Sequence, residues 1–170
     1  MNSNEIKRFS RWLGKQLLEI TSIALIAFFI AHYIAQPIIV EGSSMYPTLK
    51  DKNFGISSRL FGDDDIKRFD IVCIDMGNKK IIKRVIGLPG EDIRYTNNQL
   101  YVNGEAYEED FLEDSVNTTD FMIHVPDGAY FCLGDNREHS TDSRYYGAFD
   151  RSQIFTKDVF LLVPLKGVIN

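Results

Sequence analysis

The sequence has few cysteines and histidines and no excess of basic residues. Its 170 residues include two cysteines and three histidines, and the formal net charge at pH 7 is −5. No Cys-x-x-Cys pattern or histidine pair accompanies Cys73 or Cys132, so a zinc site is not supported and we expect two free thiols. The aspartates at 63–65 lack the alternation of a calcium loop. We therefore expect no metal, and we also expect no cofactor. Because an acidic domain binds nucleic acid poorly, we expect no nucleic-acid partner either.

The chain also lacks internal repeats, low-complexity tracts and any run of proline, glycine or serine that would mark a long linker. It contains five prolines and twelve glycines, and 44% of its residues are hydrophobic. These values are typical of one folded domain with a small additional element. A length of 170 residues leaves no room for two full domains.

Charge is absent between Glu19 and Glu41. The apolar side chains of this stretch cover all sides of a helix, and its length is close to the roughly 20 residues that a membrane-spanning helix needs. Pro37 disfavours helix at its own position and at the residue before it. We therefore expect a transmembrane anchor over residues 17–36.

The charges that flank this stretch predict its orientation. The basic residues before it are Lys7, Arg8, Arg11 and Lys15. By the positive-inside rule, residues 1–16 are cytoplasmic and residues 37–170 form an extracytoplasmic domain of a single-pass protein of the cell membrane. A cleaved secretory signal is an alternative, but its cleavage site needs small residues and Tyr33 is large. A buried core helix, the other alternative, is rarely uncharged for so long.

Beyond residue 50 the chain consists of short β-branched or aromatic runs separated by turn residues, which predicts strands. The runs are Phe54–Ile56, Asp70–Ile74, Lys80–Ile86, Asp92–Tyr95, Gln99–Val102, Ala129–Leu133 and Val159–Pro164. Residues 96–98, 102–104 and 126–128 predict hairpin turns. We expect a mainly β domain of folded antiparallel sheets. The acidic segment 105–121 is interpreted as a solvated loop.

The stretch from Val40 to Leu49 joins the apolar run to the rest of the chain. Gly42 permits backbone geometry that a side chain would forbid, and Pro47 interrupts strand pairing. Between them lie Ser43 and Ser44, whose side chains point to opposite faces if the segment is extended. The stretch therefore predicts a rigid turn that presents one hydroxyl.

Three motifs make the sequence resemble one known family. Ser44-Met45-Tyr46-Pro47-Thr48-Leu49 has the nucleophile motif of the type I signal peptidases. Residues 82–91 resemble the lysine motif of that family, and residues 134–144 resemble its third motif. The resemblance extends from the anchor to about Gly147, and 159–164 fits the closing strand. The short domain resembles the minimal, Gram-positive form of the family, whose catalytic core is mostly β.

The resemblance implies a membrane-anchored serine endopeptidase that removes signal peptides from exported preproteins. Ser44 would attack the scissile carbonyl, and Lys83 would act as the base. A lysine can do so only when it is neutral, which requires burial. On a strand, Lys83 shares its face with Ile81 and Val85, which favours desolvation.

The same resemblance implies roles for four supporting residues. Ser140 matches the hydroxyl that orients the lysine, and Asp142 and Arg144 match a structural ion pair with Arg84 as a further partner. The backbone N–H of Ser44 would meet the oxyanion. The side-chain donor that some members carry two residues before the nucleophile is absent here, because that position is Gly42.

The implied substrate is an extended signal peptide that lies between two strands, with small residues at the first and third positions before the cut. The residues that match its shallow apolar pockets are Ile38, Val40, Met45, Leu49, Ile81 and Ile82. Ordinary core packing is the alternative role for these residues. The further partners are membrane lipid and, as a candidate, the secretion translocon.

Histidine offers an alternative base, since His139 lies inside the third motif and a triad with Asp135 or Asp142 is conceivable. Three other protein classes also stay open. They are a self-cleaving Ser-Lys repressor, which would need a further domain; a non-proteolytic relative that assists assembly of surface structures such as pili; and a purely structural membrane protein. Phe69, Glu91 and Thr156 depart from the usual motifs of the family, at positions outside the Ser44 and Lys83 pair.

Overall fold

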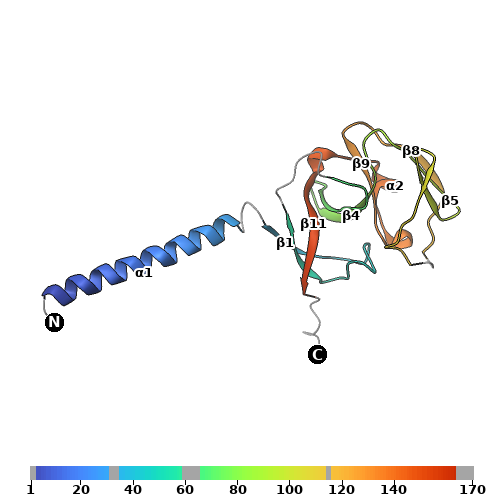
Figure 1. Cartoon of the computed structure of the whole chain (residues 1–170). Helices are drawn as coiled ribbons and strands as arrows, with labels where there is room; N and C mark the ends of the chain where they lie inside the picture. The colour runs from blue at the N-terminus through green and yellow to red at the C-terminus, as the bar shows by residue number, and fades with distance from the viewer. Residues whose placement is uncertain (1–2, 31–34, 59–65, 114–115, 164–170) are drawn as a thin grey trace, which may run out of the picture.

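The computed structural model describes residues 3–30, 35–58, 66–113 and 116–163. Its first element is α1 (Ser3–Phe29), a 27-residue helix that extends away from the rest of the chain (Figure 1). The stretch Lys7–Phe29 is long and apolar enough to cross a membrane, and its apolar window has no protein packed over it. An apolar helix without a protein partner is typical of a membrane anchor. Tyr33 lies outside the described residues.

The helix ends earlier than the expected span. It stops at Phe29, whereas Ala35 and Gln36 lie in strand β1 (Ala35–Ile39). Pro37 is opposite Ile56 of the neighbouring strand β2 (Phe54–Ser58). Proline favours extended backbone at the residue before it, and β1 is an edge strand, where the missing N–H is tolerated. The expected helical end at Gln36 is therefore wrong.

The strands of the described chain form two antiparallel sheets (Figure 1). The larger sheet has the order β1-β2-β11-β3-β4-β9-β10, and the smaller has the order β7-β6-β5-β8. The remaining strands are β3 (Ile71–Asp75), β4 (Lys80–Gly87), β5 (Asp92–Thr96), β6 (Gln99–Val102), β7 (Glu105–Tyr107), β8 (Phe121–His124), β9 (Ala129–Leu133), β10 (Phe149–Asp150) and β11 (Ile154–Val163). The short helices are η3 (Arg137–His139), α2 (Ser143–Tyr146) and η4 (Arg151–Gln153). The predicted mainly β antiparallel fold is confirmed.

Every predicted strand has a counterpart in these sheets, but one turn differs, and the sequence analysis predicts no strand at β1, β7, β8 or β10. The turn at 126–128 does not close a hairpin, because β8 before it pairs with β5 and β9 after it pairs with β4. The turn instead connects the two sheets. The sequence pattern also does not predict β8, because its apolar residues are consecutive and do not alternate with polar ones. In the structure, three of its four side chains are exposed.

Most of the described part of the acidic segment 105–121 is the exposed loop that its composition predicts, with two exceptions. It begins with β7, which pairs with β6. The Glu109 side chain is only 7% exposed and forms an ion pair with the fully buried guanidinium of Arg137. A carboxylate can be buried when a partner satisfies it, and composition does not reveal that partner.

Three apolar clusters support the fold, and one of them includes residues of the 40–49 stretch. The largest two fill the space around β3, β4 and β9 and beneath the smaller sheet. The third joins Val40, Met45 and Leu49 to Ile71 of β3 and Ile82 of β4. It therefore fixes the 40–49 stretch against the middle of the larger sheet.

Candidate active site

Ser44 lies in a compact turn, not in an extended segment. Gly42 has a φ of +89°, a backbone conformation that glycine adopts without strain. The N–H of Val40 donates to the carbonyl of Asn53 at 2.9 Å and closes the base of the turn. Since Val40 and Met45 are both buried, the backbone on either side of Ser44 is anchored in the apolar cluster.

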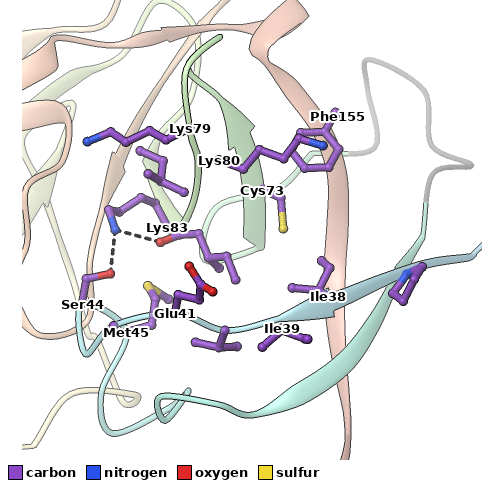
Figure 2. Close-up of a pocket in the computed structure, with 15 residues that line it drawn as sticks. Ile38, Ile39, Glu41, Ser44, Met45, Cys73, Lys79, Lys80, Lys83 and Phe155 are labelled. Atoms are coloured by element: carbon purple, nitrogen blue, oxygen red, sulfur yellow. Dashed lines mark hydrogen bonds between the residues drawn. The ribbon is translucent and has the colours of Figure 1, made fainter.

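The structure brings Ser44 and Lys83 into direct contact. The Nζ of Lys83 lies 2.8 Å from the Oγ of Ser44 and 2.9 Å from the carbonyl oxygen of Ile82 (Figure 2). Ser43 is exposed, and its carbonyl oxygen accepts a hydrogen bond from the side-chain amide of Asn136. Of the two serines, Ser44 thus has a base beside it.

Burial sets the charge state of Lys83. This residue is 3% exposed and lies in β4 opposite Val72 of β3. Burial lowers the pKa of Lys83 from its ordinary value to about 8, although the negative charges of Asp142 and Asp135 act in the opposite direction. With this pKa, roughly a tenth of the molecules carry a neutral amine at pH 7, far more than for an ordinary lysine, and a general base requires the neutral form.

The third motif packs directly on the backbone of the nucleophile. The N–H of Asn136 donates to the carbonyl of Ser44 at 3.0 Å. A Cβ atom on Gly134 would come within 2.5 Å of that carbonyl oxygen and within 2.2 Å of Ser140 Oγ. The loop can therefore approach Ser44 only with glycine at this position.

Ser140 does not make the hydrogen bond that the resemblance implies. Its Oγ is buried next to Gly134 and has no hydrogen-bond partner among the residues that the structure describes. Lys83 instead directs its amine at Ser44 and at the carbonyl of Ile82. Ser140 thus lies in the site without a hydrogen bond to the lysine amine.

Asp142 and Arg144 form the expected ion pair. The Nε of Arg144 lies 2.8 Å from Asp142 Oδ1, and Arg144 also donates to the carbonyl of Arg137 at 2.7 Å. Burial opposes ionisation of Asp142, yet hydrogen bonds from Arg144 and from the N–H of Gly134 hold the pKa of its carboxyl below the ordinary value. The pair therefore ties both ends of the 134–144 loop together.

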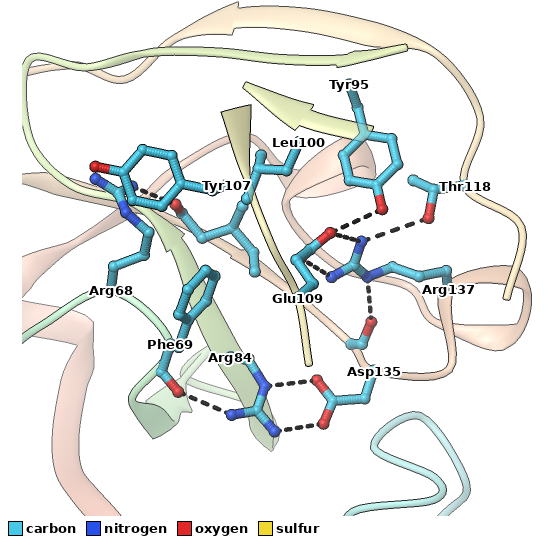
Figure 3. A network of polar contacts seen from close by, with 12 residues as sticks. Arg68, Phe69, Arg84, Tyr95, Leu100, Tyr107, Glu109, Thr118, Asp135 and Arg137 are labelled. Carbon is cyan, nitrogen blue, oxygen red and sulfur yellow. Dashed lines mark hydrogen bonds and ion pairs between the residues drawn. The ribbon is translucent and has the colours of Figure 1, made fainter. Parts of the chain in front are cut away.

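Arg84 has a different partner from the one expected. Its Nε and Nη2 donate to the two carboxylate oxygens of Asp135 at 2.8 and 2.7 Å (Figure 3). Asp135 also accepts from the hydroxyl of Thr48 at 2.6 Å, and the guanidinium lies 3.9 Å from the ring centre of Phe111. Asp135 and Asp142 are both far from Arg84 in the sequence. Only the folded structure therefore decides which of the two carboxylates lies beside the guanidinium.

A groove of about 490 Å³ leads to the Ser44 hydroxyl (Figure 2). Five of the six residues predicted for substrate pockets line it: Ile38, Val40, Met45, Ile81 and Ile82. Leu49 does not line it, because this residue is 2% exposed and belongs to the apolar cluster under the turn. Leu49 is therefore a core residue and does not form part of the groove.

The groove also contains residues that sequence reasoning missed. Glu41 stands at its β1 side, Lys79 and Lys80 at its β4 side, and Cys73 and Phe155 complete the wall. Glu41, Lys79 and Lys80 lie close to the Ser44 and Lys83 motifs in the sequence, and this proximity could have identified them. No sequence signal pointed to Phe155, which comes from β11.

No group of histidine, cysteine, aspartate or glutamate side chains in the described ranges could hold a metal ion. The aspartates 63–65 lie outside these ranges. Cys73 and Cys132 are free and buried, as expected, and burial raises the pKa of both thiols, that of Cys73 to about 11. Buried thiols of this kind are inert.

Comparison with known proteins addresses the family directly. Residues 13–163 match the family model described as "Signal peptidase, peptidase S26". The chain belongs to the signal peptidase family. It is 37% identical to signal peptidase I of Bacillus caldolyticus over 183 residues, which covers 98% of this chain and 97% of that protein. It is 36% identical to signal peptidase I S of Bacillus subtilis strain 168, over 88% of this chain and 91% of the relative.

A crystal structure of a signal peptidase I from Enterococcus faecalis V583 is 34% identical to this chain, with a TM-score of 0.49. The match covers 58% of this chain and 97% of that one. The sequence relatives, which extend over most of the chain, establish its activity as that of a signal peptidase I, a serine endopeptidase. Its substrates are signal peptides of preproteins.

Histidine takes no part in this signal peptidase site. His139 is exposed, and its Nδ1 lies 3.2 Å from the side-chain oxygen of Asn136. Among the described residues, no hydrogen bond joins His139 to Ser44, whose hydroxyl lies beside Lys83 instead. The geometry therefore does not build the alternative Ser-His-Asp triad.

Two of the departures from the usual signal peptidase motifs have a structural explanation. Phe69 has a φ of +72°, in the region that favours glycine, but its ring packs 5.2 Å from that of Phe111. Its carbonyl also accepts from Arg84 at 2.9 Å. Glu91 forms two hydrogen bonds with Arg68, at 2.7 and 2.8 Å. Both positions hold local turns outside the dyad.

Proposed function

We propose that Ser44 is the nucleophile and Lys83 the general base of this serine endopeptidase. The observation that carries the proposal is the 2.8 Å contact between Lys83 Nζ and Ser44 Oγ, made by a lysine that is 3% exposed. When the amine is neutral, its lone pair accepts the Ser44 proton while Oγ forms a bond to the scissile carbonyl carbon. No histidine, metal or cofactor is needed for this step.

The later steps use the same groups. The backbone N–H of Ser44 stabilises the oxyanion of the tetrahedral intermediate. The C–N bond then breaks, and the protonated Lys83 gives its proton to the leaving amine. Lys83 next takes a proton from the water that attacks the acyl carbonyl. As the bond between the acyl carbon and Oγ breaks, Lys83 returns that proton to Ser44 Oγ, and the carboxyl product leaves. Ser140, buried beside the loop, is our candidate for a further polar contact of the Lys83 amine.

We infer that the signal peptide binds as an extended strand in the groove, between the end of β1 and β4. Ile38 and Val40 approach it from one side and Ile81 and Ile82 from the other. These branched side chains leave shallow apolar depressions, which suit alanine-sized residues at the first and third positions before the cut. Met45, which lines the groove beside Ser44, would lie beneath the residue at the cut.

We further propose that the chain spans the membrane once, with residues 1–16 in the cytoplasm. The basic residues Lys7, Arg8, Arg11 and Lys15 support this orientation by the positive-inside rule. The site would then face the outer surface, in contact with membrane lipid and within reach of signal peptides that leave the translocon. Protease added to sealed vesicles made with the outer face exposed should remove the domain after β1 and leave the amino terminus intact.

The direct test is cleavage of a preprotein with an Ala-x-Ala site by the detergent-solubilised full chain, beside its Ser44→Ala variant. We expect the parent to cut after the second alanine and the variant to be inactive. Equal cleavage by both proteins would disprove the role of Ser44. If a well-folded parent failed to cut this and other preproteins, the non-proteolytic assembly role would return.

A further inference from the structure

The acidic segment that precedes the third motif contains one buried carboxylate. Glu109 accepts from the hydroxyl of Tyr95 at 2.7 Å and from the guanidinium of Arg137 at 2.5 and 3.3 Å (Figure 3). The side chains of Glu109 and Arg137 are 7% and 0% exposed. A pair so desolvated holds a fixed geometry, because neither charge has water as an alternative partner.

Arg137 transmits this pairing to the loop of the third motif. Its Nε donates to the carbonyl of Gly134 at 3.1 Å, and it also reaches the hydroxyl of Thr118 at 3.4 Å. The guanidinium lies 5.4 Å from the ring centre of Tyr95. Arg137 thus bonds the first residue of the loop on one side and the smaller sheet with its 105–121 segment on the other.

The same loop holds the nucleophile. Gly134 lies so close to the carbonyl oxygen of Ser44 that no Cβ would fit between them. Asn136 donates its N–H to that oxygen and its side-chain amide to the carbonyl of Ser43. A shift of residues 134–137 would therefore move the backbone of Ser44 relative to Lys83.

We propose that Glu109 is a positioning residue for catalysis, which acts through Arg137 and the 134–137 loop on the Ser44 nucleophile. The inference rests on the proposed Ser44 and Lys83 dyad. It gives the smaller sheet a function in the reaction, because Tyr95 of β5 and the segment after β7 hold the carboxylate in place. A misplacement of reacting groups by about 1 Å can cost roughly a hundredfold in rate.

The chain offers a matched control in the pair of Arg68 and Glu91. It is also a two-bond arginine–glutamate pair, with side chains 12% and 16% exposed. Its other side-chain hydrogen bonds go to the carbonyl of Ile86 and the N–H of Leu88, at the turn after β4, and Arg68 lies over the ring of Tyr107. None of these contacts involves the 134–137 loop or the 40–49 turn.

The experiment compares Glu109→Gln with Glu91→Gln in the detergent-solubilised full chain, using an Ala-x-Ala preprotein and thermal unfolding. Both variants should unfold at lower temperature. Only Glu109→Gln should lose kcat, by roughly ten- to a hundredfold with little change in KM. Its acid limb in the pH profile should also move to higher pH, because a loosened loop admits water to Lys83 and raises the pKa of that amine.

Equal kcat values for the two variants at a temperature where both are folded would overturn the proposal. If Glu109→Gln does not fold, Tyr95→Phe decides, since it removes one hydrogen bond to Glu109 and keeps the ring that stacks on Phe121. We expect Tyr95→Phe to lose kcat severalfold, and an unchanged kcat would then overturn the proposal. The Ser44→Ala variant separates the two proposals. If Ser44→Ala is inactive but Glu109→Gln and Glu91→Gln have equal kcat values, the proposed nucleophile stands and only the positioning role of Glu109 is disproved.

Discussion

The amine of Lys83 lies 2.8 Å from the hydroxyl of Ser44, although 39 residues separate them in the chain. β4 carries the lysine in the middle of the larger sheet, and the 40–49 turn packs over β3 and β4 through Met45 and Leu49. The contact therefore depends on a buried strand and an apolar anchor, and it buries the amine as it forms. One packing arrangement both places the base and lowers its affinity for protons.

The pH dependence of cleavage should follow the amine of Lys83. Because burial lowers its pKa to about 8, the protonated and inactive form predominates below this pH. We expect kcat/KM to rise with pH and to reach half of its plateau near pH 8, with a preprotein whose own groups do not titrate there. An acid limb near pH 6 would instead indicate a histidine base.

Replacement of His139 by alanine should leave activity within about twofold of the parent, since surface changes away from special contacts are usually small. The side chain is exposed and contacts Asn136, not Ser44. Initial rates on the same preprotein measure the effect, with Lys83→Ala as the inactive reference. A folded His139→Ala protein without activity, or an active Lys83→Ala protein, would revive the triad.

Gly134→Ala should reduce cleavage by at least about a hundredfold, because a misplaced nucleophile loses its geometry. The new Cβ would lie 2.2 Å from Ser140 Oγ and 2.5 Å from the carbonyl oxygen of Ser44. Gly104→Ala is the control: this glycine has a φ of +87° but no atom within 4 Å of the added Cβ. It should lose about 1 kcal/mol of stability and keep its activity. Activity in Gly134→Ala close to that of Gly104→Ala would contradict the packing argument.

Removal of Arg84 should destabilise the domain. Arg84→Met leaves the fully buried carboxylate of Asp135 without its ionic partner, and breaking a buried pair costs about 3–5 kcal/mol. In Arg84→Met with Asp135→Leu, no unpaired charge remains, so the double variant should regain much of this loss. Urea unfolding compares four detergent-solubilised proteins: the parent, Arg84→Met, Asp135→Leu and the double variant. Additive losses in the double variant would show that the two side chains do not act as a pair.

Local patterns predicted much of the fold. The runs around Lys83 and Cys132 identified β4 and β9, because they combine β-branched or aromatic residues with flanking turn residues. The same reasoning missed β8, where Met122 is 75% exposed, and placed the end of the apolar helix too late. At edges and ends, pairing with a distant strand decides the structure, and a local pattern does not contain that information.

The sequence by itself determined the apolar helix, the mainly β class, the family and the residue types of the dyad, since these depend on local composition and on contiguous motifs. Only the tertiary structure decided that Lys83 is buried, that Arg84 pairs with Asp135, and that Glu109 and Arg137 lie together. These contacts join segments that are 28 to 51 residues apart. Chain packing sets such distances, and the desolvation that gives Lys83 its pKa exists only after the sheets and the 40–49 turn have closed around it.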